Sequence, residues 1–156
     1  MLRPMCWRDL ETVVALEQDL FAGDPAWTAE QFWSELAGVP TTRWYVVAED
    51  ASGRLVGYAG LMASDLAGEP ADVQTIAVAP HAQRHGVGAS LMTGLVHEAI
   101  RRRAGSLMLD VRADNEPALA FYARHGFERV GLRRGYYQGG RDGIVMRRRL
   151  SSEASG

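Results

Sequence analysis

A glycine-bearing turn at residues 83–88, Gln-Arg-His-Gly-Val-Gly, has the residue types of an anion-binding site. It follows an apolar run that ends at Pro80, and an apolar-periodic segment begins directly after it. The first N–H groups of a helix have no intrahelical partner, and the helix dipole adds roughly half a positive charge there. Gly86 and Gly88 lack a Cβ, so a phosphate can approach the backbone. The turn therefore predicts a site for a phosphorylated ligand.

Two well-known phosphate-binding motifs do not fit this turn. A dinucleotide-binding fingerprint needs a third glycine, a place in the first strand–helix unit and an acidic residue about 20 positions later. The turn lacks that glycine and lies in the middle of the chain. A P-loop needs Gly-Lys followed by Ser or Thr, and the chain has no lysine. The remaining alternative to an anion site is a tight turn whose glycines serve backbone geometry alone.

A second segment, residues 109–127, places a carboxylate, an amide and a phenol after a short apolar run: Asp110, Asn115 and Tyr122. Tyr122 lies seven residues after Asn115, which is two turns of a helix, so both side chains share a helix face. Asn115 is the only asparagine of the chain and is also a favourable N-cap. Ligand binding and capping are compatible roles for this residue.

Together the two segments resemble the GCN5-related N-acetyltransferase (GNAT) family, whose members bind acetyl-coenzyme A (acetyl-CoA). The matching patterns are Q-x-x-G-x-G at residues 83–88, V-x-x-x-N at 111–115, A-x-x-F-Y at 118–122 and G-F at 126–127. Two matches in the expected order are far more specific than either alone. The resemblance covers roughly residues 3–150. I-A-V-x-P at 76–80 and R-R-x-Y-Y at 133–137 are similar to members that acetylate the N-terminal alanine of ribosomal proteins.

The resemblance implies a set of residues that bind acetyl-CoA. In relatives the strand that matches Ile76, Ala77 and Val78 pairs through its backbone with the pantetheine arm. The N–H groups of the following loop would bind the pyrophosphate, and Asn115 would hydrogen-bond the pantetheine. The loop residues are Arg84, His85, Gly86, Val87, Gly88 and Ala89.

The resemblance also implies acid and base roles. Tyr122 would protonate the departing coenzyme A thiolate, and a buried tyrosine that packs on the sheet is the alternative. Asp110 aligns with a glutamate that relatives use as general base, although aspartate is one methylene shorter. Asp72, a water or a purely structural ion pair of Asp110 are the other interpretations. The backbone N–H of Val78 would polarise the thioester carbonyl.

The expected activity is transfer of acetyl from acetyl-CoA to the N-terminal α-amine of a protein, in particular the N-terminal alanine of a small-subunit ribosomal protein. Trp27, Tyr136 and Tyr137, expected on loops, would line the peptide entry or else pack in the core or at its rim. One alternative is a family member that acetylates lysine side chains or small amines. Another is a catalytically silent acyl-CoA-binding module.

Composition limits the other functions. The 156 residues, 47% of them hydrophobic, predict one globular domain, and no apolar run reaches the ~18 residues of a membrane span. A formal net charge of −2 gives no argument for nucleic acid, and the histidines lack metal-ligand spacing. The single cysteine, Cys6, and the absence of a signal peptide favour the cytoplasm. The expected state is a monomer or weak dimer.

Turn and periodicity signals predict the elements that must position these residues. Their order, β-α-α-β-β-β-α-β-α-β-β, predicts a single-domain α/β GNAT fold over residues 1–150, with a mixed, mostly antiparallel sheet and helices on both faces. Residues 23–25 should end the first helix, 133–140 should form a loop, and 151–156 a disordered tail. Helices are expected at 9–21, 28–36, 86–103 and 115–125, and strands at 43–49, 54–62, 72–78, 107–111, 127–132 and 143–150.

Overall fold

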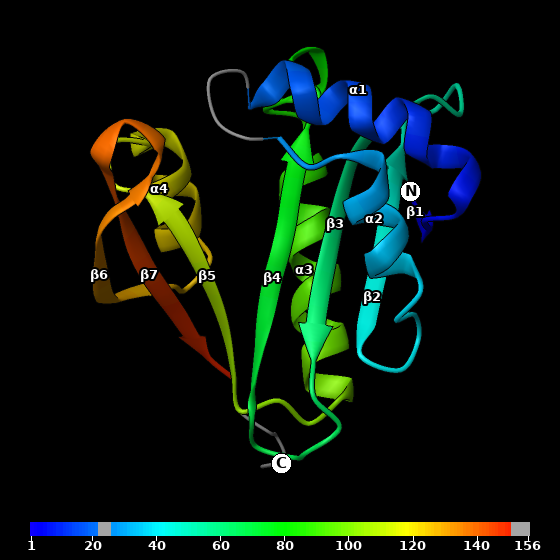
Figure 1. Cartoon of the computed structure of the whole chain (residues 1–156). Helices are drawn as coiled ribbons and strands as arrows, with labels where there is room; N and C mark the ends of the chain where they lie inside the picture. The colour runs from blue at the N-terminus through cyan, green and yellow to red at the C-terminus, as the bar shows by residue number, and fades with distance from the viewer. Residues whose placement is uncertain (22–25, 151–156) are drawn as a thin grey trace.

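The computed structural model describes residues 1–21 and 26–150. Its elements follow the predicted order and confirm the fold class (Figure 1). They are β1 (Leu2–Pro4), α1 (Leu10–Leu20), α2 (Ala29–Leu36), β2 (Arg43–Glu49), β3 (Leu55–Ala63), β4 (Pro70–Val78), α3 (Val87–Arg101), β5 (Ser106–Arg112), α4 (Glu116–Arg124), β6 (Glu128–Tyr137) and β7 (Arg141–Arg149). No helix in the described ranges is long and apolar enough to cross a membrane.

Within the described residues the strands form one seven-stranded sheet in the order β1-β2-β3-β4-β5-β7-β6. β4 and β5 pair in parallel, and the other neighbours pair antiparallel. Helices α1 and α2 cover one face and α3 and α4 the other (Figure 1). On the α1–α2 side, Val13 of α1, Phe32 of α2 and Tyr58 of β3 are fully buried. On the other side, Leu91 and Leu95 of α3 are fully buried. The sheet therefore lies between two apolar layers at β2 and β3, whereas the edge strand β6 is exposed along nearly its whole length.

The parallel pair β4–β5 is short. Pairing joins Pro70–Asp72 to Ser106–Met108 and then ends, and the two strands separate (Figure 1). The N–H of Ala79 donates to Val56 of β3. Because successive residues of a strand point their backbone groups to opposite sides, Val78 and Ile76 direct theirs away from β3, toward the opening. The opening thus receives backbone groups of β4, among them the Val78 carbonyl, which accepts the side-chain amide of Gln83.

Local sequence signals placed most element boundaries within two residues. Thr28, where a helix was expected to begin, caps α2 in a reciprocal capping box with Gln31. The hairpin between β2 and β3 closes through Asp50, whose carboxylate accepts the N–H groups of Ser52 and Arg54. The expectations for residues 23–25 and 151–156 lie outside the described residues.

The predicted loop at residues 133–140 was wrong. β6 continues to Tyr137, and a short 3₁₀ turn, Gln138–Gly140, leads into β7. Pairing of Tyr137 with Arg141 extends the β6–β7 ribbon beyond a register shift that follows Arg133. Glycines suggested a loop, but here they accommodate an irregular strand, with Gly135 in a left-handed conformation.

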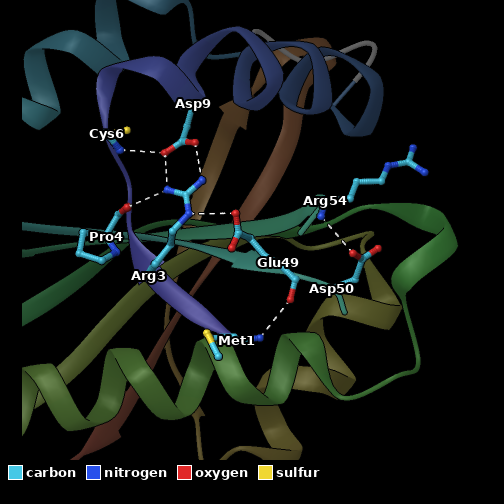
Figure 2. Close-up of polar contacts among 8 residues, drawn as sticks. All are labelled: Met1, Arg3, Pro4, Cys6, Asp9, Glu49, Asp50 and Arg54. Atoms are coloured by element: carbon cyan, nitrogen blue, oxygen red, sulfur yellow. Dashed lines mark hydrogen bonds and ion pairs between the residues drawn. The ribbon is translucent and has the colours of Figure 1, made fainter. Parts of the chain in front are cut away.

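Arg3 ties the start of the chain to α1 and β2 (Figure 2). Its guanidinium donates to both carboxylate oxygens of Asp9, at 2.7 and 2.9 Å, and its Nε donates to Glu49 at 3.0 Å. The N–H of Cys6 also donates to Asp9. The hydrogen bonds from Arg3 lower the pKa of Asp9 below its usual value. This network sets α1 against the sheet.

Candidate active site

One cavity, of about 680 Å³, lies between the end of β4, the turn before α3 and the helix α4. We call it the loop cavity. Gly86 stands at the N-cap of α3 with φ +85°, and Arg84 has φ +67°, so the turn folds into the left-handed region twice. Gln83 closes the turn from inside, because its side-chain amide donates to the Val78 carbonyl at 3.1 Å. The N-terminus of α3 thereby opens into the cavity.

Most residues predicted to bind acetyl-CoA line this loop cavity. They are Ile76, Ala77, Val78, Arg84, Gly86, Gly88 and Ala89. His85 and Val87 are not in the lining, and Val87 packs against the core. A Cβ on Gly88 would lie 3.2 Å from the Phe121 ring of α4, so the glycine allows α3 and α4 to approach closely. The cavity therefore has the glycine-bearing, N–H-rich wall that a phosphate requires.

A second cavity, of about 490 Å³, occupies the opening between β4 and β5; we call it the strand cavity. Two strand segments form its walls, Val73–Ile76 of β4 and Leu109–Arg112 of β5. The end of α1 and the residue Trp27 cover it from the side of α1 and α2. Asn115 and Tyr137 also line it.

The two cavities meet at three residues. Ile76, Ala118 and Tyr122 line both of them. Tyr122 packs edge-on against Phe121 and Phe127, with ring centroids 5.5 and 5.8 Å away. Burial, and to a lesser extent the neighbouring phenol of Tyr137, raises the pKa of Tyr122 to about 12. A protonated phenol thus stands where a ligand of one cavity reaches a ligand of the other.

Asn115 has the capping role that its position predicts. Its side-chain oxygen accepts the N–H of Ala118 at 3.2 Å at the start of α4. The same side chain belongs to the lining of the strand cavity, not the loop cavity. Its amide nitrogen therefore remains compatible with a role in ligand binding.

Asp110 lines the strand cavity and is also an ion-pair partner. Arg133 of β6 donates to its Oδ1 at 2.8 Å, and the Arg133 guanidinium lies 5.2 Å from the Tyr136 ring centroid. Asp72, the rival acid, is outside the lining of both cavities. Burial, and then the charge of Asp110, raises the pKa of Asp72. The geometry thus brings Asp110, not Asp72, into the same cavity as Tyr122.

The three aromatic residues expected at the peptide entry are not equivalent. Trp27 and Tyr137 line the strand cavity, whereas Tyr136 is 54% exposed and lies outside the lining of both cavities. Tyr136 instead contacts Tyr137 edge-on, at 5.0 Å between centroids, and stacks with Arg133. The two adjacent tyrosines thus remain in contact with each other, but of the two Tyr137 lines the strand cavity and Tyr136 faces outward.

Four polar residues of the strand cavity were not identified from the sequence: Glu17, Gln74, Thr75 and Arg112. Glu17 of α1 is 5% exposed; it accepts the Tyr58 hydroxyl at 2.5 Å and the Trp27 N–H at 3.2 Å. An acid one helical turn after the buried Val13, on the apolar face of α1, is the signal that could have revealed Glu17. No group of three or more His, Cys, Asp or Glu side chains in the described ranges could hold a metal ion.

The family assignment follows from comparison with known proteins. The model of the acetyltransferase (GNAT) family matches residues 7–127. The chain belongs to this family. It is 42% identical to the N-alpha-acetyltransferase RimI of Mycobacterium tuberculosis, over 90% of this chain and 86% of that protein. An uncharacterized Mycobacterium leprae protein is also 42% identical over 90% of this chain but is longer, and the match spans 38% of it.

A solved structure is similar over nearly the whole chain. The crystal structure of the ribosomal-protein-S18-alanine N-acetyltransferase from Escherichia coli superposes with a TM-score of 0.82 at 28% identity. The alignment covers 97% of this chain and 94% of that one. The GNAT architecture predicted from the two short motifs is therefore confirmed at the level of the complete fold.

Proposed function

We propose that the protein transfers the acetyl group of acetyl-CoA to the N-terminal α-amine of a protein, most specifically the N-terminal alanine of a small-subunit ribosomal protein. The similar proteins named RimI and ribosomal-protein-S18-alanine N-acetyltransferase support this choice of acceptor. Because ribosomal proteins are made in the cytoplasm, the reaction would take place there.

The observation that carries the proposal is the meeting of the two cavities at Ile76, Ala118 and Tyr122. A donor in the loop cavity and an acceptor in the strand cavity would place their reacting ends side by side. Direct transfer between two bound substrates needs this arrangement, since proximity and orientation supply much of the rate enhancement. No covalent enzyme intermediate is required.

The loop cavity suits acetyl-CoA as the donor. The first N–H groups of α3, with Gly86 and Gly88 beside them, would hold the pyrophosphate. The backbone groups of Ile76 that point into the opening would pair with the amide groups of the pantetheine arm, whereas the Val78 carbonyl is held by Gln83. Asn115 lines the strand cavity and caps α4 at Ala118, a residue that both cavities share, so it would hydrogen-bond the arm at its thioester end, where the cavities meet.

Three residues would act on the reacting atoms. The Val78 N–H would donate to the thioester oxygen as negative charge develops there. Tyr122, whose raised pKa keeps its proton in place, would deliver that proton to the leaving thiolate. Asp110, directly or through a water, would remove a proton from the acceptor amine with the carboxylate oxygen that Arg133 does not occupy.

An α-amine acceptor suits this modest base. The pKa of an α-amine is about 7.7–8.0, so roughly 15–25% is neutral near pH 7.2. A lysine amine, with a pKa of about 10.4, is neutral in less than ~0.1% of molecules. The α-amine thus needs little help to lose a proton, and an aspartate that is partly engaged with Arg133 is sufficient.

The strand cavity also suits a cationic peptide end. Glu17 and Asp110 contribute carboxylates, which attract the ammonium form of the acceptor. Trp27 and Tyr137 contribute aromatic surface for the first side chains of the peptide.

The experiment that tests this function offers acetyl-CoA with three acceptor classes: alanine-start peptides, lysine peptides with blocked N-termini, and polyamines. Mass spectrometry would locate the acetyl group. We expect acetylation of the alanine α-amine. Acetylation of the blocked lysine peptides or polyamines alone would contradict the α-amine assignment, and binding of acetyl-CoA without transfer to any acceptor would indicate a silent binding module.

A further inference from the structure

Gln74 occupies an irregular position on the wall of the strand cavity. Along the β3–β4 ladder, Gly60 pairs with Thr75 and Leu61 pairs with Val73, so Gln74 has no partner across from it. It is the extra residue of a β-bulge. Bulges re-aim a side chain and are frequent beside active sites.

A partly buried carboxylate holds the side chain of Gln74. Glu35 of α2, whose side chain is 13% exposed, accepts hydrogen bonds at Oε1 from Tyr45, Arg43 and Gln74, at 2.5, 2.8 and 3.3 Å. The Tyr45 ring crosses β3 at Gly60, where a Cβ would overlap it. Burial and the Glu35 contact raise the pKa of Tyr45, so its hydroxyl remains a donor. The network connects α2, β2 and the bulge of β4.

This network determines which way the Gln74 amide faces. A carboxylate only accepts hydrogen bonds, so the NH₂ group of the amide must point to Glu35. The Gln74 carbonyl oxygen accepts no hydrogen bond from the residues that the structure describes, while the side chain lines the strand cavity. An oriented acceptor is therefore left available to whatever fills the cavity.

The position of Gln74 relative to Asp110 defines what could reach this acceptor. Contact with α2 places Gln74 on the α1–α2 face of the sheet. Asp110 lies two residues after Met108, the partner of Asp72, and its side chain projects into the same cavity from β5. The two side chains thus line the same opening, Gln74 from the β4 wall and Asp110 from the β5 wall.

We propose that Gln74 is a specificity-determining residue whose side-chain oxygen accepts the N–H of the first peptide bond of the acceptor, and that Glu35 is the positioning residue that fixes this orientation. The inference rests on the proposed function and deepens it. An α-amine would interact with Asp110 while the peptide N–H that follows it donates to Gln74. A lysine side chain or a polyamine has no N–H at that distance from its amine. The site would thereby recognise a peptide terminus as such.

The test compares two alanine-start peptides that differ in one atom group. In the second peptide an ester oxygen replaces the N–H between the first and second residues. We expect the wild-type protein to prefer the amide peptide by about tenfold in kcat/KM, the effect of losing one buried hydrogen bond. Gln74→Leu and Gln74→Met should reduce this preference to near unity. A ratio of two rates is independent of the fraction of folded enzyme.

Control variants separate recognition from folding. Gln18→Leu makes the same chemical change at an exposed position of α1 and should keep the amide preference. Glu35→Gln should lower the preference, because an amide in place of the carboxylate no longer requires the Gln74 NH₂ to face it. The dissociation constant of acetyl-CoA should stay unchanged in every variant, since none of these side chains lines the loop cavity.

The outcomes distinguish this inference from the proposed function. If the wild type acetylates neither alanine peptide, both proposals are wrong. If it acetylates both peptides equally, or if Gln74→Leu keeps the amide preference, the α-amine function stands and the role of Gln74 is refuted. Loss of the preference in Gln74→Leu but not in Glu35→Gln would refute the positioning role of Glu35.

Discussion

Asp72 and Asp110 lie on adjacent parallel strands and project from the same face of the sheet, because Asp72 pairs with Met108 and Asp110 follows two residues later. Their environments differ. Asp110 accepts a hydrogen bond from Arg133. Asp72 is half-buried, and its pKa is raised first by this burial and then by the negative charge of Asp110. Asp110 thus has a cationic partner and lines the strand cavity, whereas Asp72 is harder to ionise and lies outside the lining of that cavity.

The first prediction concerns catalysis by Asp110. Asp110→Asn should lower kcat/KM for an alanine-start peptide about 100-fold, the usual scale for loss of a general base. The defect should shrink as pH rises above 8, because the acceptor amine then loses its proton without help. Asp65→Asn, in an exposed loop, is the matched control. If Asp110→Asn kept the wild-type kcat/KM, Asp110 would not be the general base, and its role would be the ion pair with Arg133.

The second prediction concerns the stability effect of Asp72. Folding raises the pKa of Asp72 above its unfolded value, which is near 3.8. Protonation of Asp72 therefore stabilises the folded protein below pH 3.8, and this contribution is lost as the pH rises through the folded-state pKa. Asp72→Asn should therefore gain stability relative to wild type between pH 3 and pH 7. Urea unfolding across this range measures it. An unchanged difference over the whole range would mean that Asp72 has equal pKa values in the two states.

The third prediction concerns Tyr122. Tyr122→Phe should lower kcat about 100-fold, since it removes the proton donor, while the dissociation constant of acetyl-CoA changes little. With the pKa of Tyr122 raised to about 12, ionisation of this phenol should not limit the wild-type rate at pH 10, where a solvent-exposed tyrosine would be half ionised. A pH–rate profile to pH 10.5 and calorimetric titration check both points. An unchanged kcat would remove Tyr122 from the mechanism.

The fold and the pair Asn115–Tyr122 were predictable because their signals are local. A capping box, a hairpin turn and a glycine-bearing loop each specify a few consecutive residues, and a helix places Tyr122 on the face of Asn115 whatever the rest of the chain does. These elements also occur in the order that the family shares, so the similarity extended local signals to the complete sheet.

The remaining features depend on pairing between distant segments. The extension of β6 to Tyr137 rests on β7, and the Arg133–Asp110 ion pair joins residues 23 positions apart. Gln74 reaches the cavity wall through a bulge, and periodicity along β4 alone gives no sign of it. A pattern read along one strand cannot show which residue of a neighbour will oppose it.

The fourth prediction concerns Glu17, which contributes a buried carboxylate to the strand cavity. Glu17→Gln keeps a side-chain acceptor for the Tyr58 hydroxyl but removes the charge that attracts a cationic terminus. We expect KM for the peptide to rise about fivefold with little change in kcat, the pattern of lost ground-state binding. Steady-state kinetics at low and high salt measure it. A fall in kcat with constant KM would instead give Glu17 a part in the chemical step.

The fifth prediction concerns the anchor of α1, the helix that carries Glu17. Arg3→Leu should cost about 1–2 kcal/mol at pH 7, less than a fully buried ion pair, because Arg3 is 36% exposed. Folding lowers the pKa of Asp9 below its unfolded value, which is near 3.8. The ionised Asp9 therefore stabilises the folded protein above pH 3.8, and this contribution is lost as the pH falls through the folded-state pKa. The difference between wild type and variant should therefore shrink from pH 5 to pH 2 in urea unfolding. Arg54→Leu is the control, because Arg54 bonds Asp50 through its backbone N–H (Figure 2). A difference that persists undiminished at pH 2 would show that Arg3 stabilises α1 through packing and not through Asp9.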